Sequence, residues 1–194
     1  MVLANSNMID MVSRQNAQIA ILEESMAEAD GFSGTNNPAR FAQAERAVKQ
    51  VLHVIRSLAA TWQPLMTRTA FLAAMGRLID DVLTRMLEYV EDLEDISEVE
   101  SEKLATLCKM FGPLEELFVD EASQQTSVAL FVPSWFKASY LSEVLTGSLV
   151  DIEFLFFEAG ALVDYSKAEL SKLIKALFSE SANRSRLLHR IEAA

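Results

Sequence analysis

The sequence predicts an all-α protein, an elongated antiparallel helical bundle, and three observations favour this fold class. Only six Gly and four Pro occur in 194 residues, so turns are few and the elements are long. Apolar residues recur every three or four positions along most of the chain, as they do on the buried face of a helix. Hydrophobic residues make up 51% and charged residues 23%, which is enough for one core and too apolar for disorder.

The first 37 residues are expected to form an N-terminal helix and a loop. A helix is predicted over Met8–Ala29, because apolar residues recur there at roughly helical spacing. The following stretch, DGFSGTNN, contains two Gly among polar residues and is typical of a loop. Asn37 is then expected to cap a helix that has Pro38 as its first residue. Residues 38–194 should form the bundle, continuous with this first part as one domain.

Two long helices should come next. The first runs from Pro38 to about Trp62 and ends before Pro64, and the second begins after Thr67 or Thr69 and runs to about Ile96. Their apolar stripes contain Phe41, Ala44, Val48, Val51, Leu52, Ile55, Leu58 and Trp62 in the first helix, and Phe71, Leu72, Met75, Leu78, Ile79, Val82, Met86, Tyr89, Val90 and Leu93 in the second. Because the connection is short, these helices should pack antiparallel.

Shorter elements fill the middle of the chain. Ser97 and Glu100 have the spacing of a capping box and should begin a helix that ends before Gly112 and Pro113. Its buried residues are expected to include Leu104, Leu107, Cys108 and Phe111. A short helical piece over residues 114–119 and a polar connection over residues 120–127 should follow. Residues 128–132 are apolar and β-branched, so a short strand is the alternative there, although such a strand would lack a partner.

The last third of the chain should contain three more helices. Ser134 is expected to cap one that continues to Phe156, and residues 160–165 break it. Ser166 and Glu169 form a second capping box. The apolar residues predicted for the two final helices are Leu170, Leu173, Ile174, Leu177 and Phe178, then Leu187, Leu188 and Ile191.

The chain is acidic, with 17 Lys and Arg against 28 Asp and Glu and a formal charge of −11. Twelve of the acids lie between Glu88 and Glu121, where only two Lys oppose them. Such a charge repels phosphate backbones and anionic lipid, so nucleic acid is not an expected partner. The acidic strip is either a solvated surface or a docking surface for a basic partner.

The sequence indicates a reducing, cytoplasmic compartment. Cys108 is the only cysteine, so no disulfide within the chain is possible, and the first residues lack the pattern of a secretory signal. No stretch is long and apolar enough to span a membrane, because Asp151, Glu153 and Glu158 interrupt the most apolar one.

No catalytic, metal or cofactor site is predicted. His53 and His189 are distant in sequence, and no H-x-x-x-H, C-x-x-C or D-x-D pattern occurs. Asp80 and Asp81 are adjacent and therefore point in different directions on a helix. The G-x-x-G of residues 31–34 lacks the flanking strand and helix of a phosphate-binding loop. The protein is thus predicted not to be an enzyme and to need no cofactor.

Aromatic residues are the remaining functional signal. Trp135 and Phe136 are adjacent at the start of a predicted helix, so one of the two rings is expected to face outward, and Phe154, Phe156 and Phe157 cover more than one face of their helix. Either the bundle encloses these rings, or another protein chain covers part of them, because exposed aromatic patches mark interfaces.

Four stretches in order resemble the carboxyl-terminal region of the zeste-white-ten family, which includes the Dsl-type tether subunits. They are KQVLHVIRSLAATWQPLM (49–66), YVEDLEDIS (89–97), FVPSWFKASYLSEVL (131–145) and LIKALFSESANRSRLLHRI (173–191). The resemblance implies the last helical bundles of a rod in a multisubunit tether. Family proteins are longer, so Met1 is expected to begin a fragment.

The resemblance also implies a function and partners. Family members act at the endoplasmic reticulum, where they tether Golgi-derived vesicles and engage SNARE proteins, and in animals they join the Rod–Zwilch complex at kinetochores. The implied partner is a large α-solenoid subunit of the Sec-thirty-nine, NAG or Rod type. The family's amino-terminal coiled region and the acidic, Trp-containing coatomer-binding loop have no counterpart in these residues.

The expected role is a non-enzymatic scaffold, peripheral at the endoplasmic reticulum, with no direct membrane insertion. A kinetochore scaffold and a purely structural extension of the rod are the alternatives. The residues expected to contribute to docking are Val132, Trp135, Phe136 and Lys137, together with Arg184, Arg186 and Arg190 of the basic last helices.

Overall fold

The computed structural model describes residues 20, 24, 27 and 30–194, so the predicted helix over Met8–Ala29 lies almost entirely outside the described residues. Within them the protein is an all-α helical bundle, as predicted. The elements, with 3-10 helices written η, are η1 (Asp30–Phe32), α2 (Pro38–Trp62), η2 (Gln63–Leu65), α3 (Arg68–Glu91), α4 (Glu98–Lys109), η3 (Gly112–Phe118), α5 (Val128–Phe131), α6 (Trp135–Thr146), α7 (Leu149–Phe157), α8 (Lys167–Leu177) and α9 (Ala182–Ala193).

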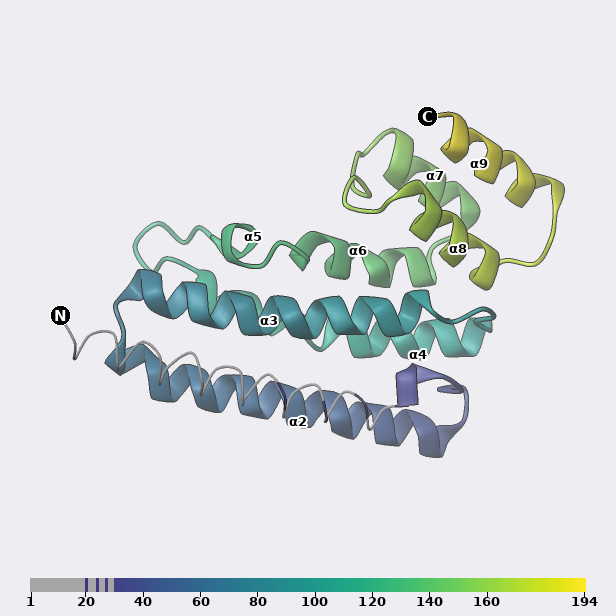
Figure 1. Cartoon of the computed structure of the whole chain (residues 1–194). Coiled ribbons are helices and arrows are strands. Elements are labelled where there is room, and N and C mark those ends of the chain that lie inside the picture. Colours follow the sequence, from purple (N-terminus) through teal and green to yellow (C-terminus); the bar gives the residue numbers. More distant parts are fainter. Residues whose placement is uncertain (1–19, 21–23, 25–26, 28–29) are drawn as a thin grey trace.

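The helices form two groups (Figure 1). The long helices α2 and α3 run antiparallel, as predicted, and α4 and α6 pack together against them. The shorter helices α7, α8 and α9 form the second group, which sits over the end of α3. The molecule is therefore an elongated bundle with a smaller helical cluster at one end.

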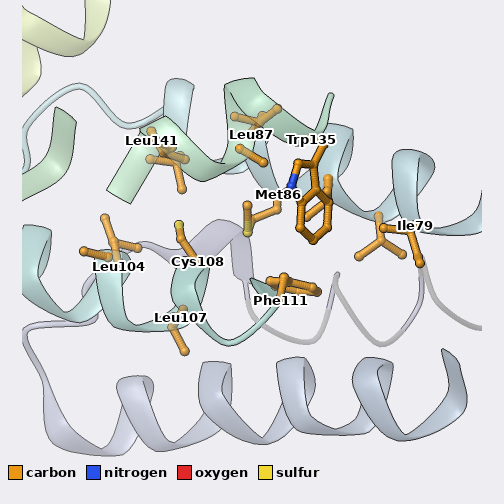
Figure 2. Close-up of a cluster of buried hydrophobic side chains, with 14 of the residues drawn as sticks. Ile79, Met86, Leu87, Leu104, Leu107, Cys108, Phe111, Trp135 and Leu141 are labelled. Carbon is orange, nitrogen blue, oxygen red and sulfur yellow. The ribbon is translucent and has the colours of Figure 1, made fainter. Parts of the chain in front are cut away.

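The helix α3 lies at the centre of the core. Met75, Leu78 and Ile79 have no exposed surface, and Met86 is 1% exposed. Figure 2 shows Ile79 and Met86 in one cluster with Leu104, Cys108, Phe111, Trp135 and Leu141, which come from α4, the segment after it, and α6. Fully burying an aliphatic or aromatic side chain of this size contributes about 1.5–3 kcal/mol, so each member of this cluster stabilises the fold.

Local capping signals set several helix ends as predicted. The Asn37 side chain accepts a hydrogen bond from the backbone N–H of Ala39 at 2.9 Å, and Pro38 is the first residue of α2. Thr67, rather than Thr69, caps α3. Both halves of the capping box form at the start of α8, where Ser166 is the cap.

The helix α3 ends at Glu91, earlier than the predicted Ile96. The backbone N–H of Ile96 donates instead to the carbonyl oxygen of Ala176 in α8, at 2.9 Å. Ile96 is also 2% exposed, so it remains a core residue although it is not helical. A contact with a helix eighty residues later thus redirects the chain before its apolar pattern ends.

The start of α4 differs from the predicted capping box. Ser97 caps the helix by accepting from the backbone N–H of Glu100 at 3.3 Å. The Glu100 carboxylate, however, accepts hydrogen bonds from the backbone N–H groups of Gly34 at 2.7 Å and Thr35 at 3.1 Å. Glu100 is 6% exposed, and it therefore attaches the loop before α2 to the start of α4.

Residues 128–131 form the short helix α5, so the alternative of a strand is wrong. A strand needs a neighbour with which to pair, whereas here the N–H of Val132 donates to the carbonyl of Val128 at 2.8 Å. Ser134 precedes α6 as predicted, but its hydroxyl does not cap the helix. It donates to Oδ1 of Asp80 in α3 at 2.6 Å and so joins α6 to the central helix.

The predicted continuous helix from Ser134 to Phe156 is wrong, because the chain breaks into α6 and α7 at Gly147 and Ser148. Gly147 is extended, with φ −79° and ψ 157°. Ser148 then forms a full capping box with Asp151, whose carboxylate accepts from the Ser148 N–H at 2.8 Å. This S-x-x-D signal is local, and the uninterrupted apolar spacing concealed it.

Candidate partner-docking surface

The helix α7 is rich in apolar residues but is poorly covered by the rest of the described fold. Seven of the nine residues of α7 are apolar, yet only Ile152 is buried. Val150 is 72% exposed and Phe154 is 53% exposed, and their spacing of four places them on one face of the helix. Helix α7 packs mainly on α9 (Figure 1), and no described residue covers Val150 and Phe154.

Acidic residues border this face. Asp151 follows Val150 and Glu158 lies four residues after Phe154, and both are exposed. The Asp151 carboxylate is held by the hydroxyl and N–H of Ser148, and these hydrogen bonds lower its pKa. It therefore stays charged at neutral pH. The exposed face of Val150 and Phe154, with these two acids beside it, is called the α7 face below.

The helix α9 supports α7 from behind. Arg190 forms an ion pair with Glu153, and its guanidinium lies 4.5 Å from the centre of the Phe157 ring. Leu187 and Ile191 are 3% and 0% exposed and complete the contact between the elements. Arg190 therefore contacts α7 within the chain rather than extending freely into solvent.

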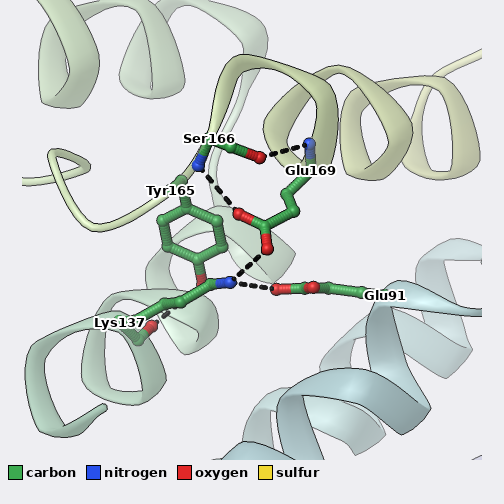
Figure 3. A network of polar contacts seen from close by, with 5 residues as sticks. All are labelled: Glu91, Lys137, Tyr165, Ser166 and Glu169. Atoms are coloured by element: carbon green, nitrogen blue, oxygen red, sulfur yellow. Dashed lines mark hydrogen bonds and ion pairs between the residues drawn. The ribbon is translucent and has the colours of Figure 1, made fainter. Parts of the chain in front are cut away.

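A polar network fixes this cluster on the main bundle (Figure 3). Nζ of Lys137 in α6 lies 3.0 Å from Oε1 of Glu91 in α3 and 2.9 Å from Oε1 of Glu169 in α8. The Tyr165 hydroxyl donates to the carbonyl oxygen of Lys137 at 2.9 Å. One lysine thus links three helices. Lys172 of α8 adds a further ion pair with Asp92, at 2.9 Å.

Burial and charge act in opposite directions on this network. Desolvation raises the pKa of Glu91 despite the hydrogen bond from Lys137. Burial raises the pKa of Glu169 too, but the hydrogen bonds from Lys137 and Ser166 outweigh it, and the pKa is lowered. Burial lowers the pKa of Lys137, and its bonds to both carboxylates more than reverse this. The lysine is therefore charged and firmly bound at neutral pH.

The structure separates the residues predicted for docking. Val132 and Trp135 are 0% and 6% exposed, so these two side chains are core residues rather than accessible surface. Lys137 belongs to the network described above. Phe136 is 50% exposed and Arg186 is also exposed. The guanidinium of Arg184 donates to the carbonyl oxygen of Phe178 at 2.6 Å, which fixes the turn between α8 and α9.

The α7 face was only partly anticipated. The cluster of Phe154, Phe156 and Phe157 indicated surplus aromatic area, and the structure leaves Phe154 half exposed. Val150 was missed, because the sequence analysis singled out only aromatic residues as candidates for exposed apolar surface, whereas Val150 is 72% exposed. The capping box at Ser148 was the signal that could have separated α7.

The acidic strip between Glu88 and Glu121 has two parts in the structure. Most of its carboxylates are exposed, some around the end of α3 and the start of α4 and others in and after η3, whereas Glu100 is buried and the Glu91 side chain is only 13% exposed. Among the described residues, no three His, Cys, Asp or Glu side chains lie together as a metal site would require. No described helix combines the length and apolarity needed to cross a bilayer.

Comparison with known proteins finds similarity to one family. The family described as the ZW10 C-terminal helical domain matches residues 46–191. The chain is 28% identical to the centromere/kinetochore protein zw10 homolog of Mus musculus over 191 residues, or 93% of this chain. It is 27% identical to the protein of that name from Arabidopsis thaliana over 180 residues. The chain spans about a quarter (24%) of the length of these relatives.

Proposed function

Because this chain belongs to the family of the ZW10 C-terminal helical domain, we propose that it is a non-enzymatic scaffold in a vesicle-tethering complex at the endoplasmic reticulum. In this role it holds a large α-solenoid subunit, the type of partner that the resemblance to Dsl-type tether subunits implies. The tether serves retrograde transport from the Golgi. The observation that carries the proposal is the α7 face, an apolar surface that none of the described residues covers.

The α7 face has the composition of a docking site. Burying the exposed parts of Val150 and Phe154 contributes about 2–3 kcal/mol. Two such apolar residues with charged residues at the edge reproduce the centre and rim of a protein interface. The acids at this rim favour a partner surface that carries Lys or Arg beside its apolar residues.

The mechanism of such a scaffold is mechanical. The Lys137 network and the hydrogen bond from Ile96 to Ala176 hold α8 against α3 and α6. The α7 face is therefore presented at a fixed angle to the long axis of the bundle (Figure 1). A partner bound there is held in a defined geometry, which is what a tether requires.

The test uses the full-length protein that contains this chain and its α-solenoid subunit. Phe154→Asp places a charge in the centre of the α7 face and should weaken binding roughly thirtyfold, equivalent to about 2 kcal/mol. Leu130→Asp is the matched control, because Leu130 is 82% exposed on α5, outside the α7 face. Equal affinities for the two variants would refute docking through the α7 face.

The other accessible residues are tested in the same assay. Phe136→Asp and Arg186→Glu should each weaken binding if the interface extends from the α7 face across α6 and α9. Melting curves measured by circular dichroism control for folding, because all of these side chains are partly or largely exposed in the free chain.

A second candidate function is a kinetochore scaffold, which the names of the relatives favour, and the resemblance to the family implies the Rod–Zwilch complex as its setting. Phe154→Asp should then reduce recruitment of the protein to kinetochores in dividing cells, whereas the tether function predicts slowed return of Golgi proteins to the endoplasmic reticulum. A third candidate function is purely structural, in which the chain only extends the rod of the tether. It predicts that the purified full-length protein binds no α-solenoid subunit.

A further inference from the structure

A small cavity lies between α4 and α6, beside the central helix α3. Its volume is about 170 Å³. The walls come from Leu83 of α3, Cys108 and Phe111 near the end of α4, and Trp135, Ala138 and Ser142 of α6. Figure 2 shows Cys108, Phe111 and Trp135 in the buried cluster that surrounds it. The cavity is separate from the α7 face, since none of its lining residues comes from α7, α8 or α9.

The serine hydroxyls that line the cavity are already hydrogen-bonded within α6. The hydroxyl of Ser139 donates to the carbonyl oxygen of Trp135 at 2.8 Å, and that of Ser142 donates to the carbonyl of Ser139 at 3.0 Å. Burial raises the pKa of the Cys108 thiol to about 12, so the thiol is neutral. Apolar walls of this kind favour apolar groups, and an enclosed cavity of about 150 Å³ is large enough for a benzene ring.

The cavity has an accessible mouth. Lys109, Gly112 and Ser139 line it and are all exposed, whereas Leu83, Phe111 and Trp135 are buried. Among the lining residues Lys109 alone is charged, and it is placed at the rim rather than in the walls. The buried part of a bound ligand would therefore contact apolar walls, and the part at the mouth would lie near a single cation.

We propose that this cavity receives one apolar side chain of a partner protein, the size of Phe or Leu, next to an acidic residue that pairs with Lys109. The volume fits a single ring. The hydroxyl groups of the walls are already hydrogen-bonded, which favours an apolar occupant. The cation at the rim favours a negative charge next to that occupant. The choice of a protein occupant rests on the proposed scaffold function. A deep apolar anchor of this type typically contributes far more to affinity than the contacts around it.

The first experiment measures whether the cavity accepts such a group. The 194-residue chain is titrated with benzene and with 3-phenylpropionate, which resembles a Phe side chain beside a carboxylate. Dissociation constants on the order of 1 mM are expected for molecules of this size, and a melting temperature raised by roughly 3–5 °C at tenfold excess over that constant. The carboxylate should improve binding at low salt, and Lys109→Gln should remove that advantage.

Variants locate the binding. Ser139→Leu adds an apolar side chain at the exposed mouth and should abolish the rise in melting temperature for both probes. Ala129→Leu adds the same surface at an exposed position of α5 and should leave it unchanged. Absence of any shift, or an equal shift in Ser139→Leu and Ala129→Leu, would overturn the proposal.

The second experiment identifies the occupant. In the full-length protein, Ser139→Leu should weaken binding of the α-solenoid subunit at least fivefold, and Lys109→Glu should weaken it most at low salt. If the probes bind but Ser139→Leu leaves this affinity unchanged, the occupant is not a side chain of that partner and the inference fails. The scaffold function is judged separately, because Phe154→Asp lies outside the cavity.

Discussion

Replacing Lys137 with Met should destabilise the protein through the carboxylates that it leaves behind. Lys137 is 15% exposed and contacts Glu91, which is 13% exposed, at 3.0 Å and Glu169, which is 37% exposed, at 2.9 Å. Met preserves most of the aliphatic side chain and removes the charge. Glu91 would then be a largely buried carboxylate without its cation, while Glu169 would keep the N–H of Ser166 at 2.8 Å.

The magnitude follows from burial. Removing one partner of a buried ion pair costs about 3–5 kcal/mol, because an uncompensated charge remains in a poorly hydrated place. The pair with Glu169 is more exposed and contributes at most about 1 kcal/mol. We therefore expect Lys137→Met to lower the free energy of unfolding by about 3 kcal/mol. Glu91→Gln alone should cost about 1 kcal/mol, and adding it to Lys137→Met should restore about 2 kcal/mol.

Urea denaturation at pH 7, followed by circular dichroism, measures all three variants. A loss below about 0.5 kcal/mol in Lys137→Met, or no recovery in the double variant, would refute the assignment of Glu91 as the unpaired charge. The pH dependence is a second check. The pKa of Lys137 in the folded protein is above its ordinary 10.5, so its stabilisation is complete below pH 10.5 and declines as pH rises through the folded value. That alkaline decline should be smaller in Lys137→Met.

Three further predictions concern other parts of the fold. A Cβ on Gly76 would lie 2.5 Å from the carbonyl oxygen of Phe131, so Gly76→Val should displace α5 and lower the unfolding free energy by about 2 kcal/mol. Urea denaturation measures this change, and an unchanged unfolding free energy would show that α5 can move away at no cost. Ser148→Ala removes the cap of α7 and should cost about 1 kcal/mol in the same assay, whereas Ser179→Ala, at an exposed position, should cost nothing measurable. Because the pKa of Cys108 is about 12, the native thiol should react with a thiol reagent at pH 8 far more slowly than the urea-unfolded one, and equal rates would contradict its burial.

The candidate site was only partly predictable, because exposure is a property of the assembled fold. The sequence identified Phe154 and Phe136 as aromatic residues that could face outward, and the structure leaves both about half exposed. It gave Val132 and Trp135 the same role, although both are buried. Apolar residues in a helix carry the same pattern whether their neighbour is in the same chain or in another one.

The sequence by itself determined the all-α class and the helix ends that depend on neighbouring residues. Asn37 with Pro38 and Ser166 with Glu169 act within one turn, so their hydrogen bonds form wherever the helix lies. The start of α7 at Ser148 is set by the same kind of local signal. The predicted continuous helix was wrong there because the apolar spacing was given more weight than the capping box.

Only the tertiary structure decided where long-range polar contacts redirect the chain. Asp80 binds Ser134, Glu100 binds the loop at Gly34, and Ile96 leaves the helical path to bond with α8. Each of these partners lies more than fifty residues away, so no local pattern encodes the pairing. Buried polar groups must find hydrogen-bond partners, and which partners are within reach is fixed only when the helices have packed.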